Sequence, residues 1–319
     1  PRLDWTRPVD GSNPANEWQR LHEIDETITL FNPASGYIFN TNNWPCTAAG
    51  VSSPKCASYP SYMWSLPENA RGRNAARVFK EAKGLDIDGL IAASYDTRLQ
   101  AFEPLVPAVI ADYDALPPED PRKAALAEQI DALRSWNMRY AIDSVPTSLA
   151  VYWGQDLVAQ HGARAKLETI PPVDYIAQRL TPADRLDGLL RASDKLTADF
   201  GDWRTPWGEI NRFQRLSGAV DQQYDDSKPS IPVPFTSANW GSLASFGMTA
   251  KQTTKRIYGD RGNSFVAAVE FGPKVRAKSI LAGGQSSDPR SPHFNDQAAM
   301  YARGEFKDVL FYKEDVLKH

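Results

Sequence analysis

The sequence has no run of about 18 or more apolar residues, so no helix of this 319-residue chain is expected to span a membrane. It has no long basic run, and its formal net charge of −3 gives no indication of a nucleic-acid partner. No signal peptide is visible, and the first residue is Pro1 rather than Met, which favours a processed end. The 42% of hydrophobic residues suffice for the core of one large or two ordinary domains.

The usual signatures of a self-contained hydrolase are also missing. There is no Gly-x-Ser-x-Gly nucleophile elbow, and no His-Glu-x-x-His zinc helix, because His22-Glu23 lacks the second histidine. No Cys-x-x-Cys pair and no Gly-rich phosphate loop between a strand and a helix occur. The four histidines are scattered along the chain. A serine or metal hydrolase complete within this chain is therefore not expected.

Cysteine is scarce, with Cys46 and Cys56 as the two copies. The loop between them contains Gly50 and Pro54 and can bend back on itself, which predicts a disulfide. Two free buried thiols are the alternative. A disulfide would indicate an oxidising compartment, so that the protein would be periplasmic or secreted.

Tryptophan and proline, in contrast, are plentiful. The chain has 9 Trp and 24 Pro, which favour long ordered loops and deep clefts over a repeat protein or a disordered chain. A Trp-rich chain of this kind also fits a non-catalytic binding module of a secreted protein. This second class of function stays open on composition alone.

Periodicity places strands at both ends of the chain and helices in the middle. Strands are predicted at 27–31 and 37–39, on either side of an Asn-Pro turn. Helical spacing is found at 69–82, 86–93, 99–116, 120–136, 148–160 and 181–201. Segments 264–271 and 275–281 flank a Gly-Pro-Lys turn and predict a hairpin, followed by a short helix from Ser291 and a strand at 309–312.

The predicted fold class is therefore α+β. A helical insertion at about 69–200 lies between strand regions 27–42 and 206–312. The two strand regions are expected to join one sheet, with the helices inserted between them.

One segment carries a family resemblance: Asn-Pro-Ala-Ser-Gly-Tyr-Ile-Phe-Asn-Thr-Asn-Asn-Trp-Pro at 32–45. It resembles the Asn-Pro…Gly-Tyr-strand-Asn-x-Asn-Asn-x-Pro segment of the penicillin acylases, which are N-terminal-nucleophile hydrolases. Trp5 and Pro8 before it, and a helix with Arg71, Arg73 and Arg77 after it, are similar too. Further similar runs are Leu-Arg-Ser-Trp at 133–136, Pro-Trp-Gly-Glu-Ile-Asn-Arg at 206–212 and Gly-Gly-Gln-Ser-Ser-Asp-Pro at 283–289. The last run, with Ser-Pro-His-Phe at 291–294, looks most like the acyl-homoserine-lactone and aculeacin-type acylases.

The resemblance implies an architecture and a mechanism. The chain would be the C-terminal part of the large subunit of an acylase with the αββα fold. An N-terminal Ser, absent from this chain, would attack the amide carbonyl of a small N-acyl substrate. Its partners would be the N-terminal part of the large subunit and the small subunit from the same precursor. The substrate would be an acyl-homoserine lactone, a lipopeptide or a β-lactam, and this chain alone would be inactive.

The resemblance also assigns residues. The oxyanion donor of the family is the second Asn of the Asn-x-Asn pattern, which falls on Asn42. The Arg that orients it falls on Arg71, with Arg73 as competitor. A neutral amide at a strand end suits an oxyanion hole, because it donates without titrating and is held rigidly. The alternative for Asn42 is an ordinary turn residue, and for Arg71 a solvated helix residue.

Weaker assignments surround this pair. Tyr37 and Trp44 either line an acyl pocket or belong to the core, and Asn43 is expected to shape the turn. Several family members bind calcium through a carboxylate in the loop after the oxyanion Asn, but residues 44–66 contain no Asp or Glu. A structural calcium in the full enzyme fits the resemblance without support from this chain, and no cofactor is expected. The loop between Cys46 and Cys56 changes the family's spacing between Asn and Arg.

Overall fold

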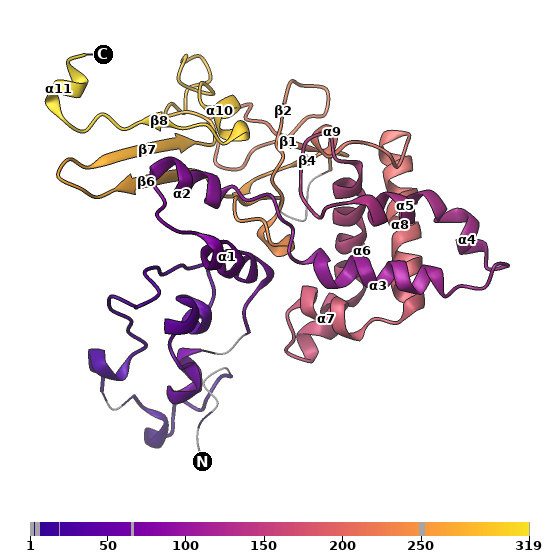
Figure 1. The fold of residues 1–319 in the computed structure, drawn as a ribbon, viewed down its shortest axis with the longest axis horizontal. Helices are drawn as coiled ribbons and strands as arrows, with labels where there is room; N and C mark the ends of the chain where they lie inside the picture. The colour runs from indigo at the N-terminus through magenta and orange to yellow at the C-terminus, as the bar shows by residue number, and fades with distance from the viewer. Residues whose placement is uncertain (1–2, 4–6, 19, 65–66, 249–252, 319) are drawn as a thin grey trace.

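The computed structural model describes residues 3, 7–18, 20–64, 67–248 and 253–318. Pro1 and Trp5 lie outside this described part. Three regions follow each other along the chain: a segment of loops and short 3-10 turns up to Trp64, a run of helices, and a region of short strands (Figure 1). Within the described residues, no helix is both long enough and apolar enough to cross a bilayer.

The helices confirm most of the predicted helical middle. They are α1 (Ala70–Glu81), α2 (Ile87–Ser94), α3 (Phe102–Asp114), α4 (Pro121–Ala125), α5 (Ala127–Ser135), α6 (Val145–Leu167), α7 (Pro172–Arg179), α8 (Pro182–Phe200), α9 (Trp207–Ile210), α10 (Ala298–Arg303) and α11 (Lys313–Val316). Side chains cap several of them, as the Asn69 side chain does for α1 and the Thr181 side chain for α8. Gly201 ends α8 in a left-handed conformation (φ +90°), which a glycine adopts without strain.

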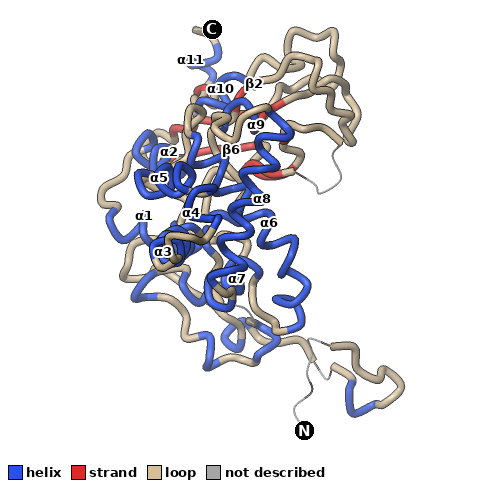
Figure 2. Tube along the Cα trace, turned by 90° about the vertical axis from the view of Figure 1, so that its right-hand side faces the viewer, coloured by secondary structure: helices blue, strands red, loops and turns tan. Residues whose placement is uncertain are grey.

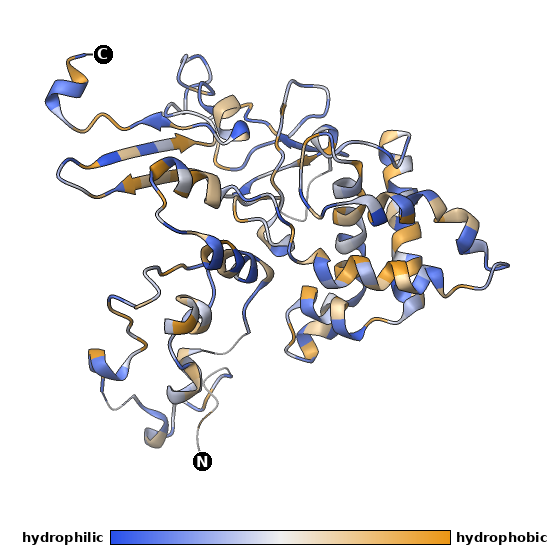
Figure 3. Cartoon of the chain, viewed as in Figure 1, coloured by the Kyte–Doolittle hydropathy of each residue, from blue (hydrophilic) through white to orange (hydrophobic). Residues whose placement is uncertain are grey.

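Helices α3, α5, α6, α7 and α8 pack on one another and form what we call the helical body. Its core consists of large apolar side chains with almost no exposed surface, among them Leu105, Ile130, Leu149, Trp153 and Leu189. Hydrophobic residues are visible along α3 and on α8 in Figure 3. The apolar spacing that predicted these helices is therefore the spacing of their buried faces.

Two helical predictions differ from the structure. The segment 120–136 was predicted as one helix but is divided into α4 and α5 at Leu126, whose φ of −110° and ψ of 3° are not helical. Leu126 is fully buried, so packing of its side chain outweighs helix continuity at this residue. Helix α7 was not predicted, because it begins at the second of two consecutive prolines.

The strands form three small sheets. They are β1 (Asn211–Phe213), β2 (Ile231–Pro232), β3 (Phe246–Gly247), β4 (Ile257–Tyr258), β5 (Arg261–Gly262), β6 (Phe265–Glu270), β7 (Arg276–Leu281) and β8 (Lys307–Asp308). Their orders are β2-β1-β4, β3-β5 and β6-β7-β8. The predicted hairpin is confirmed as the antiparallel pair of β6 and β7, with Phe265 opposite Leu281.

The end of the chain corrects two predictions. The last strand is β8 at 307–308 rather than 309–312. The last-but-one helix, α10, begins at Ala298 rather than at Ser291, because residues 291–297 bond to each other in turns. Ser291 Oγ accepts from the backbone N–H of His293 (3.1 Å), and His293 Nδ1 lies 2.9 Å from Asp296 Oδ2.

The predicted strands at 27–31 and 37–39 are not formed, so strands are found at one end of the described chain and not at both. Figure 2 shows the strands, in red, gathered away from the N-terminus. Residues 33–41 nevertheless alternate between more exposed and more buried side chains, as a strand with one covered face does. The alternation covers the segment predicted as a strand at 37–39 but not the one at 27–31. A strand also requires a neighbour, and among the described residues no strand lies beside this segment.

Candidate oxyanion site

The extended segment 37–42 lies over helix α1 and carries Asn42 at its end. The Tyr37 ring stacks on Phe79 of α1 with 4.9 Å between ring centroids, and the Phe39 ring lies 5.9 Å from the same ring. Thr41 is buried, whereas Asn42 is exposed in this chain. Asn42 has a φ of +58°, a left-handed conformation that Asn tolerates better than most residues. Its backbone N–H donates to Asn40 Oδ1 at 2.8 Å, which holds this turn.

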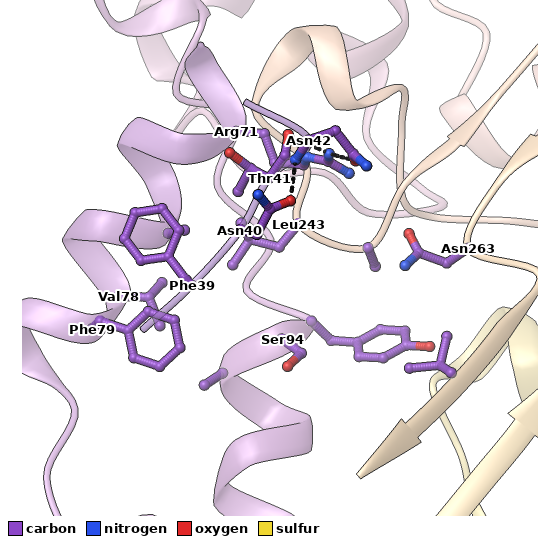
Figure 4. A pocket seen from close by; sticks show the side chains of 15 residues that line it. Phe39, Asn40, Thr41, Asn42, Arg71, Val78, Phe79, Ser94, Leu243 and Asn263 are labelled. Atoms are coloured by element: carbon purple, nitrogen blue, oxygen red, sulfur yellow. Dashed lines mark hydrogen bonds between the residues drawn. The ribbon is translucent and has the colours of Figure 1, made fainter. Parts of the chain in front are cut away.

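Arg71 in the first turn of α1 fixes the side chain of Asn42. One guanidinium nitrogen, Nη2, donates to the Thr41 carbonyl oxygen at 2.6 Å and also to Asn42 Oδ1 (Figure 4). A guanidinium only donates, so the Asn42 atom that it meets must be the oxygen. The amide nitrogen, Nδ2, is therefore directed away from Arg71. Among the described residues Nδ2 has no hydrogen-bond partner, which leaves two N–H groups for a ligand.

The environment of Arg71 strengthens this donor. Burial lowers the pKa of the Arg71 guanidinium from its ordinary value, and the nearby Glu68 carboxylate acts in the opposite direction. An arginine remains charged at any working pH. A cation bonded to the carbonyl end of an amide polarises the amide, so its N–H groups become better donors.

The two arginines that the sequence left open are separated by the geometry. Arg73 donates to Asp174 Oδ1 at 2.8 Å, to Gln100 Oε1 at 3.1 Å and to the Glu68 carbonyl oxygen at 2.6 Å. These bonds join α1 to the helical body. The structure thus brings Asn42 together with Arg71, and it places Arg73 in a different network.

Two cavities meet at this pair of residues. A smaller cavity of about 330 Å³ is walled mostly by apolar side chains, including Phe39, Val78, Phe79 and Val266. A larger one of about 1020 Å³ has aromatic and polar walls, including Trp207, Trp240, Phe246, Gln155 and Asp174. Four residues line both: Thr41, Asn42, Arg71 and Asn263. The Asn42 amide therefore lies at the boundary between an apolar and a mixed cavity.

The weaker sequence assignments lie beside these cavities rather than in their walls. Neither Tyr37 nor Trp44 is among the lining residues of the two cavities. Tyr37 packs on Phe79, and the lining position is taken by Phe39 two residues later. Substrate contact by Tyr37 or Trp44 stays a prediction. Asn43 donates to Glu68 Oε1 at 2.9 Å and to the Pro67 carbonyl oxygen, in line with its expected role in the turn.

Cys46 and Cys56 form the predicted disulfide, with 5.5 Å between their Cα atoms. The loop that they close, which we call the disulfide loop, runs along one edge of the extended segment. The Phe39 N–H donates to the Ala48 carbonyl oxygen at 2.8 Å, and the Ser35 N–H donates to Ser52 Oγ at 3.1 Å. The loop therefore covers one edge of the segment that carries Asn42.

The described residues also bear on two other kinds of site, a metal site and a Trp-rich binding surface. Within the described residues, no three His, Cys, Asp or Glu side chains lie close enough together to hold a metal ion. Five of the tryptophans are buried structural residues: Trp136, Trp153, Trp203, Trp207 and Trp240. These five tryptophans are thus packed in the core, with Trp207 and Trp240 also lining the larger cavity, and they do not form an exposed Trp-rich surface.

Sequence reasoning missed two residues of the site, Asn263 and Glu68. Asn263 Oδ1 accepts from the Ser245 N–H at 2.6 Å, and its side chain lines both cavities. Glu68 accepts hydrogen bonds from three neighbours near Asn42 and Arg71. Asn263 gave no signal, since it follows the two-residue strand β5, which is too short to leave a pattern in the sequence. Glu68 stands directly before the helix cap Asn69, where a carboxylate is favoured by the helix dipole.

Comparison with known proteins identifies a family model and a solved structure that this chain resembles. The family model described as penicillin amidase matches residues 1–318. A thermostable penicillin G acylase from Alcaligenes faecalis has a similar fold, with a TM-score of 0.50 and 17% sequence identity. The match covers 95% of this chain and 58% of the acylase chain. At this identity the likeness concerns the fold alone, and this chain spans a little over half of the length of that acylase.

Proposed function

Because this chain belongs to the penicillin amidase family, we propose that it supplies the oxyanion-binding half of an amide hydrolase. The enzyme would remove the acyl group from an N-acyl substrate such as an acyl-homoserine lactone, a lipopeptide or a β-lactam. Family membership supports hydrolysis of amides. The sequence at 283–297 resembles that of acyl-homoserine-lactone and aculeacin-type lipopeptide acylases, which favours the first two of these substrates.

The single observation that carries this proposal is the orientation of the Asn42 amide. Arg71 occupies Oδ1, which leaves Nδ2 free to donate from a residue that lines both cavities. When an amide carbonyl is attacked, negative charge develops on its oxygen, and a donor already in place stabilises that charge. Arg71 holds the amide and, as a half-buried cation, strengthens it. No proton needs to leave either residue during the reaction.

The arrangement of the cavities matches the two sides of a scissile amide. A carbonyl oxygen at Asn42 Nδ2 would place one substituent in the apolar cavity beside Phe39 and Phe79. The other substituent would extend into the larger cavity beside Trp240. An acyl chain is apolar and a leaving amine is polar, so we assign the smaller cavity to the acyl side and the larger one to the amine side.

The nucleophile in this proposal is an N-terminal Ser on a segment outside this chain, with the remaining large subunit and the small subunit as partners. Successive N–H groups of an extended segment point to opposite edges. Phe39 N–H bonds to the disulfide loop, so the N–H groups of Ile38 and Asn40 point to the other edge, where the described residues offer them no partner. Across the smaller cavity lies β6, whose outer edge is also unpaired in the described part. Two open edges facing one cavity support the docking of further strands there.

The disulfide between Cys46 and Cys56 supports a periplasmic or secreted location, because such bonds persist in oxidising compartments.

The test is replacement of Asn42 in the enzyme produced from its full precursor. Asn42→Ala removes the donor, and Asn42→Asp keeps an oxygen for Arg71 but replaces the donating nitrogen. Both should lower kcat by about 10²–10³-fold with little change in KM. Wild-type turnover by Asn42→Asp would refute the proposal.

A pair of arginine variants tests the geometry of the site. Arg71→Lys cannot bond Thr41 O and Asn42 Oδ1 with one planar group, so it should lower kcat. Arg73 lines the larger cavity but bonds to Asp174, Gln100 and the Glu68 carbonyl oxygen rather than to Asn42, so Arg73→Lys should alter KM or stability more than kcat. Equal effects on kcat would remove the special role of Arg71.

A further inference from the structure

The carboxylate of Glu68 lies between the two members of the proposed site. Its Oε1 accepts from Asn43 Nδ2 at 2.9 Å and from the Asn69 N–H at 2.8 Å. Its Oε2 accepts from the hydroxyl of Thr47. Asn43 directly follows Asn42, and Asn69 is the capping residue of the helix that begins with Ala70 and Arg71. One side chain thus ties the segment after the oxyanion donor to the helix that orients it.

The atoms around Glu68 define what this site can hold. All three neighbours of the carboxylate are donors: an amide N–H, a backbone N–H and a hydroxyl. Each donor occupies one acceptor position of the carboxylate, so protein groups supply partners for both of its oxygens. The position at the N-terminus of the 12-residue helix α1 adds the favourable dipole. Glu68 is therefore a clamp made of protein groups alone.

Gly72 makes room for this clamp. A Cβ atom at Gly72 would lie 1.9 Å from Glu68 Oε1 and 2.1 Å from Glu68 Cδ. Any other residue would therefore displace the carboxylate or the helix. Glycine is a poor choice inside a helix because of its conformational freedom. Its presence in α1 is explained by the space that Glu68 occupies.

The turn at Asn42 needs such a clamp. Asn42 has a positive φ, which costs energy for a residue with a Cβ unless its surroundings hold it. Asn40 Oδ1 holds the N–H on one side of the turn at 2.8 Å, and Glu68 holds the Asn43 side chain on the other. Oxyanion stabilisation requires that the donor stays in place during the reaction.

We propose that Glu68 is a positioning residue for the oxyanion donor, acting through Asn43 and Asn69 on Asn42 and Arg71, and that Gly72 is present to admit its carboxylate. This inference rests on the proposed function of Asn42. It assigns Glu68 no contact with the substrate.

Two single variants of the complete processed enzyme test the clamp. Glu68→Gln keeps the shape but places an NH₂ group against one of the donors. Gly72→Ala keeps Glu68 but takes its space. Each should lower kcat about tenfold and change KM by less than about twofold, because a slightly displaced donor weakens the transition state more than substrate binding. The control is Gly162→Ala in α6, where a new Cβ would meet Val158 Cγ1 at 3.6 Å, an ordinary contact. This variant should keep the wild-type kcat.

A double variant separates positioning from general stability. In an Asn42→Ala background the donor is gone, so Glu68→Gln should cause no further loss of kcat. A purely structural role would multiply the two losses, and that result would overturn the inference. If Glu68→Gln does not mature, Thr47→Val removes one of the three bonds and should lower kcat about threefold, whereas an unchanged kcat would overturn the clamp.

The two proposals fail in different ways. Full activity of Asn42→Ala would remove the proposed function itself. Loss of activity in Asn42→Ala together with a wild-type kcat in Glu68→Gln and Gly72→Ala would leave the function standing and overturn the role of Glu68 alone.

Discussion

The helical body and the segment from 7 to 64 differ in how far they bury their apolar side chains. In the helical body, long helices bury whole side chains such as Trp153 and Leu149 against each other. In the described part of the N-terminal segment, helical structure is limited to 3-10 turns of three residues, and apolar side chains remain exposed: Phe31 at 92%, Leu21 at 84% and Trp18 at 80%. The candidate site belongs to the second region. The candidate site thus lies on the part of the chain that leaves more of its large apolar side chains exposed.

Helix α1 is the joint between the two regions. One side of it carries Arg71 and Phe79, which contact the extended segment. The same helix carries Asn74, which is fully buried and donates to the carbonyl oxygens of Arg98 and Gly241 at 3.2 and 3.0 Å. Helix α1 therefore fixes the site to the rest of the chain, even though the segment that carries Asn42 has little core of its own.

The largest effect should come from emptying the core of the helical body. Trp153→Ala removes a fully buried side chain of α6 and its hydrogen bond to the Arg185 carbonyl oxygen (3.0 Å). We expect a loss of about 3–5 kcal/mol in the free energy of unfolding. Trp18→Ala in the N-terminal segment, where the residue is 80% exposed, should change it by less than about 0.5 kcal/mol. Urea denaturation followed by circular dichroism measures both, and equal losses would contradict the comparison.

Removal of the disulfide should act on the other region. The double variant Cys46→Ser/Cys56→Ser frees the disulfide loop, which holds the Phe39 N–H. The loop is short, so the cost should be on the order of 2–3 kcal/mol. It should appear as faster hydrogen exchange at Phe39 and Ser35, with exchange in α6 and α8 unchanged. Faster exchange in α8 by the same factor would show that the two regions unfold together.

The same contrast explains which parts of the fold the sequence could predict. Helices such as α6 and α8 follow from local periodicity, and the β6–β7 hairpin follows from its Gly-Pro turn. The segment 33–41 has the alternation of a strand, but whether it pairs depends on residues far away or on another polypeptide. Strands of two residues, such as β4, leave no readable pattern.

The site shows the same limit on a smaller scale. The motif resemblance led to Asn42 and to two candidate arginines. Residues two positions apart lie about 200° apart around a helix, so Arg71 and Arg73 cannot both face Asn42. Sequence alone does not reveal the rotation of the helix, which is set by packing of Asn74 and Phe79. Glu68 could not be predicted, because its partners Asn43, Thr47 and Asn69 meet only when the chain is folded.

A third effect should appear at the joint as the pH is lowered. Burial would raise the pKa of Asp96, but hydrogen bonds from Arg77 and the Arg98 N–H outweigh it and hold the pKa below its ordinary value of 3.8. The stabilisation is therefore fully present above about pH 4 and is lost as the pH falls through the lowered pKa of the folded state. The protection factors of the α1 amides, which correct for the intrinsic pH dependence of exchange, should then decrease below about pH 4.

Two variants check this pH dependence. Asp96→Asn should weaken the joint at neutral pH and remove its contribution to the acid-side slope. Asp202→Asn, which alters an aspartate whose side chain is 57% exposed, should leave the pH dependence of hydrogen-exchange protection in α1 unchanged. We expect a smaller effect than from loss of the disulfide, because Asn74 still joins α1 to the Arg98 and Gly241 backbone. If Asp96→Asn still loses protection in α1 below about pH 4 to the same extent as the wild type, other carboxylates cause the pH dependence.

The smallest effect on stability should be the most informative about assembly. Phe31 in the N-terminal segment is 92% exposed, and Leu167 at the end of α6 is 86% exposed. Phe31→Ser and Leu167→Ser should each change the free energy of unfolding of the chain by less than about 0.5 kcal/mol. If the N-terminal segment is completed by the rest of the enzyme, Phe31→Ser should lower the yield of assembled enzyme in size-exclusion chromatography, whereas Leu167→Ser should not. Equal yields would mean that neither exposed side chain is needed for assembly. Contact with another segment would then have to involve the unpaired backbone edges at Ile38 and β6.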